Sequence, residues 1–376
     1  MDLRELMTVV DVPPSRADVG RAVAAGRRRS RRRAVFGAAA AVLVVVGSVT
    51  VFEQVTRGST GTPVQLPAGP APSAAPPPGC RVETYATPGT VNAVDEGGRY
   101  LVGALYTGNA PSPVRWVDGR PAPIAGATGT PVAVNRSGVV AGFDSNEQDQ
   151  YQGWLWRDGK VTRLAKVSGY KWTMPQGINA RGDVVGYAMG DALDLSIPVL
   201  WPADRPGTVV KLKLPSGVGV KGVVMSRATG IADDGTIVGV VKGAPVRWKP
   251  DGTGSALPLP SSDNNGGYVN GVRGTVAFGI FYGKGVVELL RWDLTAGTVT
   301  SLGADSGSLL SGTSSGWVVT WGEDHNPAAR ISPGGQRIPL TQPSGGGAIA
   351  VSVSDDGATI VGFVAGTTKR PVVWHC

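Results

Sequence analysis

One phrase recurs seven times along this chain, and its spacing constrains the fold more than any other feature. Each copy has a short apolar run, an Asn or Asp, a Gly turn, a Val-rich run that ends in Gly, and a segment that closes on Trp. Residues 177–186, followed by residues 198–201, form the clearest copy. The turn glycines are Gly98, Gly138, Gly182, Gly235, Gly274, Gly316 and Gly357, with spacings of 40, 44, 53, 39, 42 and 41 residues.

The closing tryptophans keep the same step, with Ile331 in the sixth position. They are Trp116, Trp156, Trp201, Trp248, Trp292 and Trp374. A period of about 40–45 residues built from short strands is typical of a β-propeller with one four-stranded blade per repeat. The 56 glycines and 29 prolines agree with a turn-rich, all-β chain. The sequence therefore predicts a seven-bladed propeller over residues 80–376.

The residue types within the repeat have structural explanations. β-Branched runs suit half-buried strands, and the Asn or Asp near a Gly favours a tight turn with left-handed backbone geometry. We expect each Trp to pack between neighbouring blades, with its indole N–H on a backbone acceptor.

The two cysteines mark the ends of the predicted propeller, since Cys80 opens it and Cys376 is the final residue. The last repeat stops at Trp374 and lacks the strand that follows the Trp in complete repeats. Residues 80–85 alternate in a way that could supply that strand and so remove an open sheet edge. We predict this ring closure, locked by a Cys80–Cys376 disulfide; the alternative is two free or intermolecular thiols.

An apolar run of 19 uncharged residues, 34–52, precedes the propeller. As a helix it would span about 28 Å, close to the thickness of a bilayer's hydrocarbon core. The arginine cluster at residues 27–33 predicts that residues 1–33 stay in the cytoplasm and the C-terminal domain lies outside. The alternative is a cleaved signal peptide, although no small-residue cleavage site follows the run. We predict a single-pass membrane protein with an extracellular propeller.

The segments on either side of the predicted helix differ in composition. Residues 1–33 contain nine Arg and four acidic residues, and we interpret them as an orientation signal or, alternatively, a docking peptide for a cytoplasmic regulator. Residues 53–79 are rich in Pro, Gly and Ala, which predicts an extended linker.

Charge argues against a nucleic-acid partner for the folded domain. The formal net charge is +8, of which residues 1–33 contribute +5 (nine Arg against four acidic residues). The remaining +3 is spread over more than 300 residues, which is too dilute for a phosphate-binding face. We expect a monomeric propeller whose partner, if any, is an extracellular protein or a cell-wall polymer.

The inventory of catalytic and metal-binding residues is small. There are two histidines, His325 and His375, and zinc sites need about three or four Cys, His or acidic ligands. Residues 312–316 match the G-x-S-x-G string, but no helix is expected after them, as a nucleophile elbow requires. We therefore predict no catalytic residues, no cofactor and no metal centre.

Two longer loops are the candidate binding sites, because variable loops on a rigid scaffold usually carry recognition. The first contains Asp144, Asn146 and Asp149, and the second contains Asp191 and Asp194. The first loop could hold Ca²⁺ through its oxygen ligands, although its spacing is not that of an EF-hand. The alternative is a solvated loop.

The repeat resembles the extracellular HAF-repeat family of bacteria. The likeness is closest over residues 177–186 and 153–164 and extends from about residue 91 to residue 376. The His-Ala-Phe triplet of that family is replaced here, for example by Pro113-Val114-Arg115. The resemblance implies an exported propeller and carries over no catalytic residues. The arginine-rich head and single anchor also resemble those of actinobacterial membrane proteins.

These features favour a non-enzymatic, membrane-anchored scaffold that binds a partner outside the cell. Two alternatives remain: a propeller hydrolase or lyase acting on glycans, and the ectodomain of a transmembrane signalling protein. A carboxylate pair converging on a channel mouth would favour the enzyme, since the fold alone does not confer activity.

Overall fold

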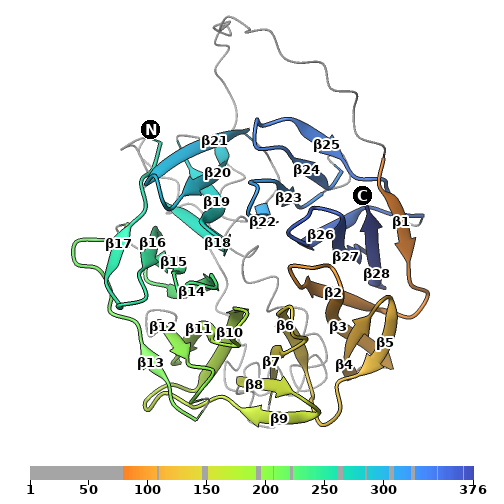
Figure 1. Ribbon diagram of the computed structural model, residues 1–376, viewed down its shortest axis with the longest axis horizontal. Coiled ribbons are helices and arrows are strands. Elements are labelled where there is room, and N and C mark those ends of the chain that lie inside the picture. Colours follow the sequence, from red (N-terminus) through yellow and green to blue (C-terminus); the bar gives the residue numbers. More distant parts are fainter. Residues whose placement is uncertain are drawn as a thin grey trace, which may run out of the picture. The chain divides into compact units, whose positions relative to one another are not determined.

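The computed structural model describes residues 79–376, apart from residues 108–109, 146–150, 192–195, 206, 221–222, 261–265, 284–285, 305–308, 323–326, 345 and 367. Its strands form seven four-stranded antiparallel sheets around a common centre (Figure 1). The predicted all-β class and seven-bladed propeller are thereby confirmed. The segments predicted as cytoplasmic (1–33), transmembrane (34–52) and linker (53–79) lie outside the described residues, except for Gly79. Within the described part, no helix is long and apolar enough to cross a membrane.

Each blade is a meander whose first strand lies nearest the centre and whose fourth lies at the rim (Figure 1). The first three blades comprise β2 (Gly89–Val94), β3 (Tyr100–Thr107), β4 (Ala110–Val117) and β5 (Arg120–Pro123); β6 (Thr130–Val134), β7 (Val140–Ser145), β8 (Tyr151–Arg157) and β9 (Lys160–Arg163); and β10 (Trp172–Ile178), β11 (Val184–Met189), β12 (Ser196–Trp201) and β13 (Val210–Lys211).

The remaining four blades repeat this arrangement, and the last of them takes its rim strand from the start of the domain. They comprise β14 (Ser226–Ile231), β15 (Ile237–Val241), β16 (Ala244–Trp248) and β17 (Gly254–Ala256); β18 (Gly267–Arg273), β19 (Val276–Tyr282), β20 (Val287–Asp293) and β21 (Thr298–Ala304); β22 (Leu309–Gly312), β23 (Val318–Thr320), β24 (Ala329–Ile331) and β25 (Arg337–Pro339); and β26 (Ala348–Val353), β27 (Thr359–Val364), β28 (Arg370–His375) and β1 (Arg81–Thr84).

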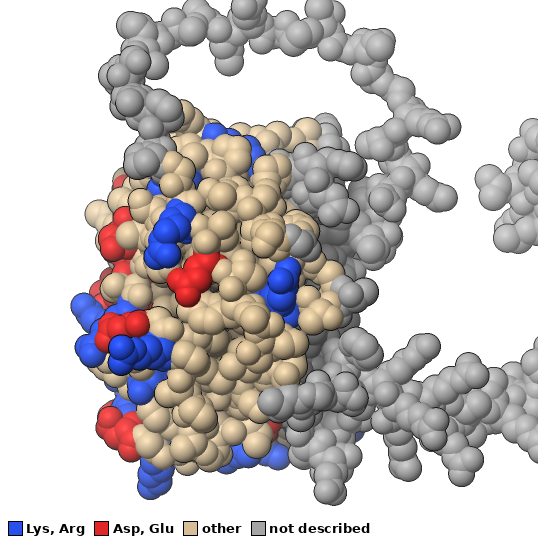
Figure 2. All heavy atoms as spheres, turned by 90° about the vertical axis from the view of Figure 1, so that its right-hand side faces the viewer, with Lys and Arg blue, Asp and Glu red and all other residues tan. Residues whose placement is uncertain are grey.

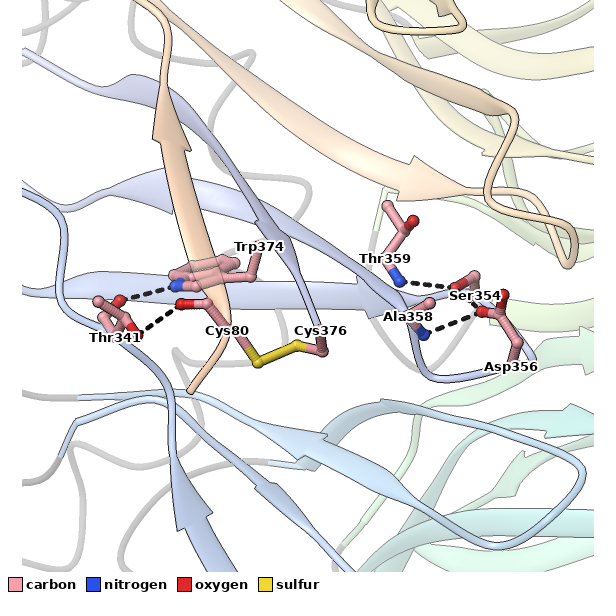
Figure 3. The surroundings of a disulfide bond; sticks show 8 residues. All are labelled: Cys80, Thr341, Ser354, Asp356, Ala358, Thr359, Trp374 and Cys376. Carbon is pink, nitrogen blue, oxygen red and sulfur yellow. Dashed lines mark hydrogen bonds between the residues drawn. A yellow bond between two sulfur atoms is a disulfide. The ribbon is translucent and has the colours of Figure 1, made fainter. Parts of the chain in front are cut away.

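The ring closes as the sequence predicts. Strand β1 pairs antiparallel with β28, with Val82 opposite Trp374, and so completes the seventh blade. A disulfide joins Cys80 and Cys376, whose Cα atoms are 4.2 Å apart although 296 residues separate them in sequence (Figure 3). The predicted disulfide is confirmed, and both ends of the domain are held in one blade.

The Asn-to-Gly phrase of the repeat forms the turn between the first and second strands of a blade. In the second blade the Asn135 side-chain oxygen accepts hydrogen bonds from the backbone N–H groups of Ser137 and Val139, each at 3.1 Å. Gly138 has a φ of 72°, a left-handed conformation that Gly adopts without steric cost. The Asn side chain therefore satisfies the turn's backbone donors, and the Gly lets the chain reverse.

A bulge explains why the second strand of most blades carries a Gly. Each innermost strand has a register shift at the same level, for example between Val91 and Ala93. A Gly of the second strand lies opposite this level of the innermost strand. A Cβ added at Gly103 would lie 1.9 Å from the Thr90 carbonyl oxygen, and one added at Gly362 would lie 1.8 Å from the Ile349 carbonyl oxygen. Only a residue without a side chain fits this close approach of two backbones.

The tryptophans pack as predicted in most blades. The indole N–H groups of Trp201, Trp248, Trp292 and Trp374 donate to backbone carbonyls at 2.7–2.9 Å. Each of these side chains is at most 1% exposed. They fill the space between one blade and the connection that leads into it.

Two blades depart from the predicted Trp pattern. In the second blade Trp154, two residues before the predicted Trp156, makes the buried hydrogen bond, because Gly142 leaves room for its ring. Trp156 instead lies under the Arg115 guanidinium, 4.6 Å from ring centroid to Cζ. In the first blade the buried Trp116 N–H has no acceptor among the described residues, and its ring meets Tyr85 edge-on at 5.9 Å.

Candidate functional site

The central channel has two different ends. The end surrounded by the turns between the first and second strands of the blades is called the turn face. The opposite end, called the loop face, carries the connections between second and third strands and the connections from one blade to the next. The first strand of every blade runs from the loop face to the turn face, so a residue's position in that strand gives its depth in the channel.

The bulges place seven side chains in one ring around the channel. The bulge residues are Asn92, Val132, Gln176, Thr229, Asn270, Leu310 and Val351. They and the residues that follow them toward the turn face line a cavity of about 150 Å³. Among the described residues, Arg273 is the one charged side chain in this lining.

The polar bulge residues join neighbouring blades. The Asn92 side-chain amide donates to the Pro131 carbonyl at 2.9 Å, and the Thr229 hydroxyl donates to the Val269 carbonyl at 2.7 Å. Asn270 reaches the next blade's Leu309 carbonyl in the same way. These groups satisfy backbone acceptors at the bulges, so their polarity has a structural explanation.

At the turn face, two ion pairs connect blades that are not adjacent in the ring. Arg273 of the fifth blade lies 3.3 Å from Glu96 of the first blade, measured between Nη1 and Oε1. Arg136 of the second blade pairs with Asp233 of the fourth. Because the turns are the innermost parts of the blades at this end, such pairs extend over the channel mouth. Glu96 and Asp233 are therefore carboxylates at a channel mouth, and each of these two is paired with an arginine.

Adjacent turns are also linked at this face. The backbone N–H and the hydroxyl of Ser314 donate to the Asp355 carboxylate at 2.5 and 2.6 Å. Ser314 is the serine of the G-x-S-x-G string, and it lies in the turn between β22 and β23. Its hydroxyl therefore joins the sixth and seventh blades, in agreement with the prediction that the string is not a nucleophile elbow.

The structure describes two of the five predicted loop residues. The Asp144 carboxylate forms an ion pair with Arg163 at 2.7 Å and accepts a hydrogen bond from the Thr128 hydroxyl at 2.5 Å. Asp191 pairs with Lys171 at 2.5 Å. Asn146, Asp149 and Asp194 lie outside the described residues. Within the described ranges, no group of three His, Cys, Asp or Glu side chains is arranged to hold a metal ion.

Aromatic residues lie at the loop-face ends of several strands, a feature that sequence reasoning missed. In the second and third blades, Tyr151 meets Phe143 at 5.5 Å and Trp172 at 6.2 Å between ring centroids. In the fifth blade, Tyr268 and Tyr282 form an edge-to-face pair at 5.8 Å. Burial, and then the neighbouring Tyr268, raise the pKa of Tyr282 to about 12, so its phenol is neutral at physiological pH.

One charged residue lies among these rings. Arg227 is the second residue of β14, and its guanidinium carbon lies 5.7 Å from the centroid of the Tyr268 ring. The signal in the sequence was weak: an Arg in the short strand Ser226–Ile231, whose other residues are small or apolar. Because the depth of each position in the channel cannot be read from sequence, Arg227 could not be distinguished from the surface arginines.

Charged side chains of both signs alternate on one side of the propeller. Figure 2 presents the side on which β1 and β28 lie, and basic and acidic side chains are interspersed there among uncharged ones. Ion pairs such as Arg99–Asp118, at 3.7 Å, are exposed and contribute little to stability.

Comparison with solved structures identifies the fold. An oligogalacturonate lyase from Vibrio parahaemolyticus matches with a TM-score of 0.55 at 8% identity, covering 79% of this chain and 97% of its own. The β-propeller domain of Cps50 (Swd1) from Myceliophteria thermophila matches with 0.51 at 14% identity, covering 79% and 99%. A prolyl endopeptidase matches with 0.55 at 13% identity, covering 77% of this chain but 48% of its own.

No family model and no curated protein sequence matches this chain. At these identities the structural matches show the fold alone, and they include proteins with different activities. The chain is a seven-bladed β-propeller whose function has to be argued from its own residues.

Proposed function

We propose that this protein is a membrane-anchored, extracytoplasmic propeller that acts as a non-enzymatic scaffold and binds a protein or cell-wall polymer on its loop face. One observation carries the proposal: two carboxylates at the turn face, Glu96 and Asp233, are paired with arginines of other blades. Glu96 pairs with Arg273 and Asp233 with Arg136. A glycan hydrolase would need two carboxyl groups about 5–9 Å apart that are free to act on substrate. The loop face is then the end available for a partner.

The proposed location rests on the sequence. The apolar run at residues 34–52 follows seven residues of which six are Arg, which favours an anchor with its N-terminus inside. A disulfide between the two ends of the propeller is compatible with an oxidising compartment outside the cytoplasm. Such a bond is rare in reducing compartments, so it supports export.

Protease protection of the full chain in intact cells tests the topology. With an epitope tag at each end, external protease should remove the C-terminal tag and spare the N-terminal one. An alkaline carbonate wash should leave the protein in the membrane fraction. A chain released by the wash, or a protected C-terminal tag, would contradict the anchored arrangement.

Sedimentation with purified cell walls tests the binding role, using the full chain in detergent. A loop-face variant replaces residues 146–150 with a Gly-Ser segment, and a matched control changes the exposed rim residue Arg120 to Gln. We expect the control to sediment like the wild type and the loop-face variant to stay in solution. Equal sedimentation of all three would contradict a role for this loop, and release of reducing ends from the walls would favour the enzyme instead.

A further inference from the structure

Arg227 occupies a level of the channel at which the other blades carry uncharged residues. It lies one residue before Ala228, which faces the glycine of the second strand, Gly239. The residues at the same level in other blades are Thr90, Thr130, Met174, Tyr268 and Ile349. A charge at this level has therefore no part in the repeat's architecture.

The Arg227 side chain is buried, and no described residue accepts a hydrogen bond from it. The residue is 5% exposed, and its Nε atom is fully enclosed with no hydrogen-bond partner among the described residues. No described carboxylate pairs with it, and its guanidinium lies over the face of Tyr268. A buried charge is costly unless it is paired and hydrogen-bonded, and a ring face offers no acceptor for the guanidinium N–H groups.

Nearby groups do not supply the missing negative charge. The positive charge of Arg227 interacts electrostatically with Tyr282 and Tyr187 and lowers the pKa values of both phenols. Burial is the larger effect and raises both pKa values, so both phenols stay protonated. Of the Arg227 side-chain nitrogens, Nε alone is fully enclosed, so the Nη atoms remain open to a ligand.

We propose that Arg227 is the anion-binding end of a ligand site on the loop face, and that it receives the carboxylate of a ligand whose ring lies against Tyr268. The planar guanidinium offers a two-pronged donor that matches a carboxylate. A single cation balances a single negative charge, which favours a carboxylate over a dianionic phosphate. The proposal rests on the loop face being the binding face, as argued above.

Titration of the full chain in detergent with small probes tests this site by isothermal calorimetry. Four probes are compared. Benzoate has both a carboxylate and a ring, benzyl alcohol has the ring without the charge, and acetate has the carboxylate without the ring. The fourth probe is inorganic phosphate. We expect saturable binding of benzoate, at least tenfold weaker binding of acetate and of phosphate, and none of benzyl alcohol. Tighter binding of phosphate than of benzoate, or no saturation by benzoate, would overturn the proposal.

Variants show whether benzoate binds at Arg227 or is attracted by the overall positive charge of the protein. Arg227→Met removes the charge and places at this level the residue that the third blade already carries at position 174. The matched control is Arg330→Met, because Arg330 also has a buried Nε without a described partner and lies 5.3 Å from the face of Trp317. We expect at least a tenfold loss of benzoate affinity for Arg227→Met, a smaller loss for Arg227→Lys, and no change for the control.

Two further readouts keep the outcomes distinct. Thermal unfolding shows whether Arg227→Met remains folded; if it does not, Tyr268→Leu, which keeps the charge and removes the ring, should still reduce benzoate affinity more than acetate affinity. Unchanged benzoate binding in both variants would overturn the site. Failure of benzoate binding while cell walls still sediment with the wild type would leave the scaffold role intact, and the reverse result would contradict the scaffold role alone.

Discussion

The hydroxyl of Thr341 donates a 2.6 Å hydrogen bond to the carbonyl of Cys80 (Figure 3). The carbonyl of Thr341 in turn accepts the indole N–H of Trp374 at 2.7 Å. The connection between the sixth and seventh blades therefore holds both the residue that precedes the rim strand and the Trp of the strand beside it. The disulfide is one of several bonds that close the ring.

Removing the disulfide should destabilise the propeller without abolishing its fold. For Cys80→Ser combined with Cys376→Ser we expect a loss of about 2–5 kcal/mol in the free energy of unfolding, because the bond restricts a very long loop in the unfolded chain. The strand pairing between β1 and β28 remains in the variant. Urea denaturation followed by tryptophan fluorescence measures the difference, and wild type treated with reductant should match the variant. A midpoint unchanged by both treatments would contradict this account.

The tryptophans provide a matched pair of substitutions. Trp292 and Trp116 are both 0% exposed, but only the first has an acceptor, the Pro258 carbonyl at 2.7 Å. Trp292→Phe leaves that carbonyl without its partner, whereas Trp116→Phe removes a buried N–H that has none among the described residues. We expect Trp292→Phe to cost about 1 kcal/mol more than Trp116→Phe. Equal losses in urea denaturation would show that packing alone decides the cost.

Acid should destabilise the third blade through Asp183. Burial alone would raise the pKa of this carboxyl, but hydrogen bonds from the Ala203 backbone, the Asn179 amide and Arg181 outweigh it and hold the pKa below its ordinary value of 3.8. A carboxyl whose pKa is lower in the folded state stabilises the fold above the unfolded pKa. That contribution is lost as the pH falls through the folded pKa.

Comparison of Asp183→Asn with wild type measures this effect. We expect the variant to be less stable at pH 7, and the gap between the two proteins to shrink between about pH 5 and pH 2. The control is Asp204→Asn, which changes an exposed carboxylate in the connection between β12 and β13 of the same blade. A gap that stays constant with pH would mean that Asp183 contributes through packing and hydrogen bonding alone.

The sequence was sufficient to predict the ring of blades, but not which side chains meet at the two ends of the channel. Blade number and closure follow from local features, namely the turn spacing and the strand missing after Trp374, so they could be read from one chain. The pair between Arg273 and Glu96 depends on two turns that lie 177 residues apart and meet only when the ring closes. The depth of Arg227 likewise depends on the bulge that sets the register of its strand.

The sequence also did not predict which of two tryptophans in the second blade is the hydrogen-bonded one. The repeat places Trp156 in the second blade where other blades have their buried Trp, yet Trp154 makes the buried hydrogen bond. Both residues lie on the same face of β8, so spacing alone cannot decide between them. The space above Gly142 decides, because the ring of Trp154 occupies it.

The glycine of the second strand gives the sharpest test of the bulge. At Gly362 an added Cβ would lie 1.8 Å from the Ile349 carbonyl oxygen, and that oxygen belongs to a backbone held by its own sheet. Gly362→Ala should therefore cost about 3 kcal/mol or more, because two strands must separate to admit a methyl group. Gly207→Ala is the control, since an added Cβ there meets no atom within 4 Å and should change stability by less than about 0.5 kcal/mol. Urea denaturation of both variants measures the costs, and a small loss at Gly362 would mean that the bulge can relax and that the recurrent glycine has another cause.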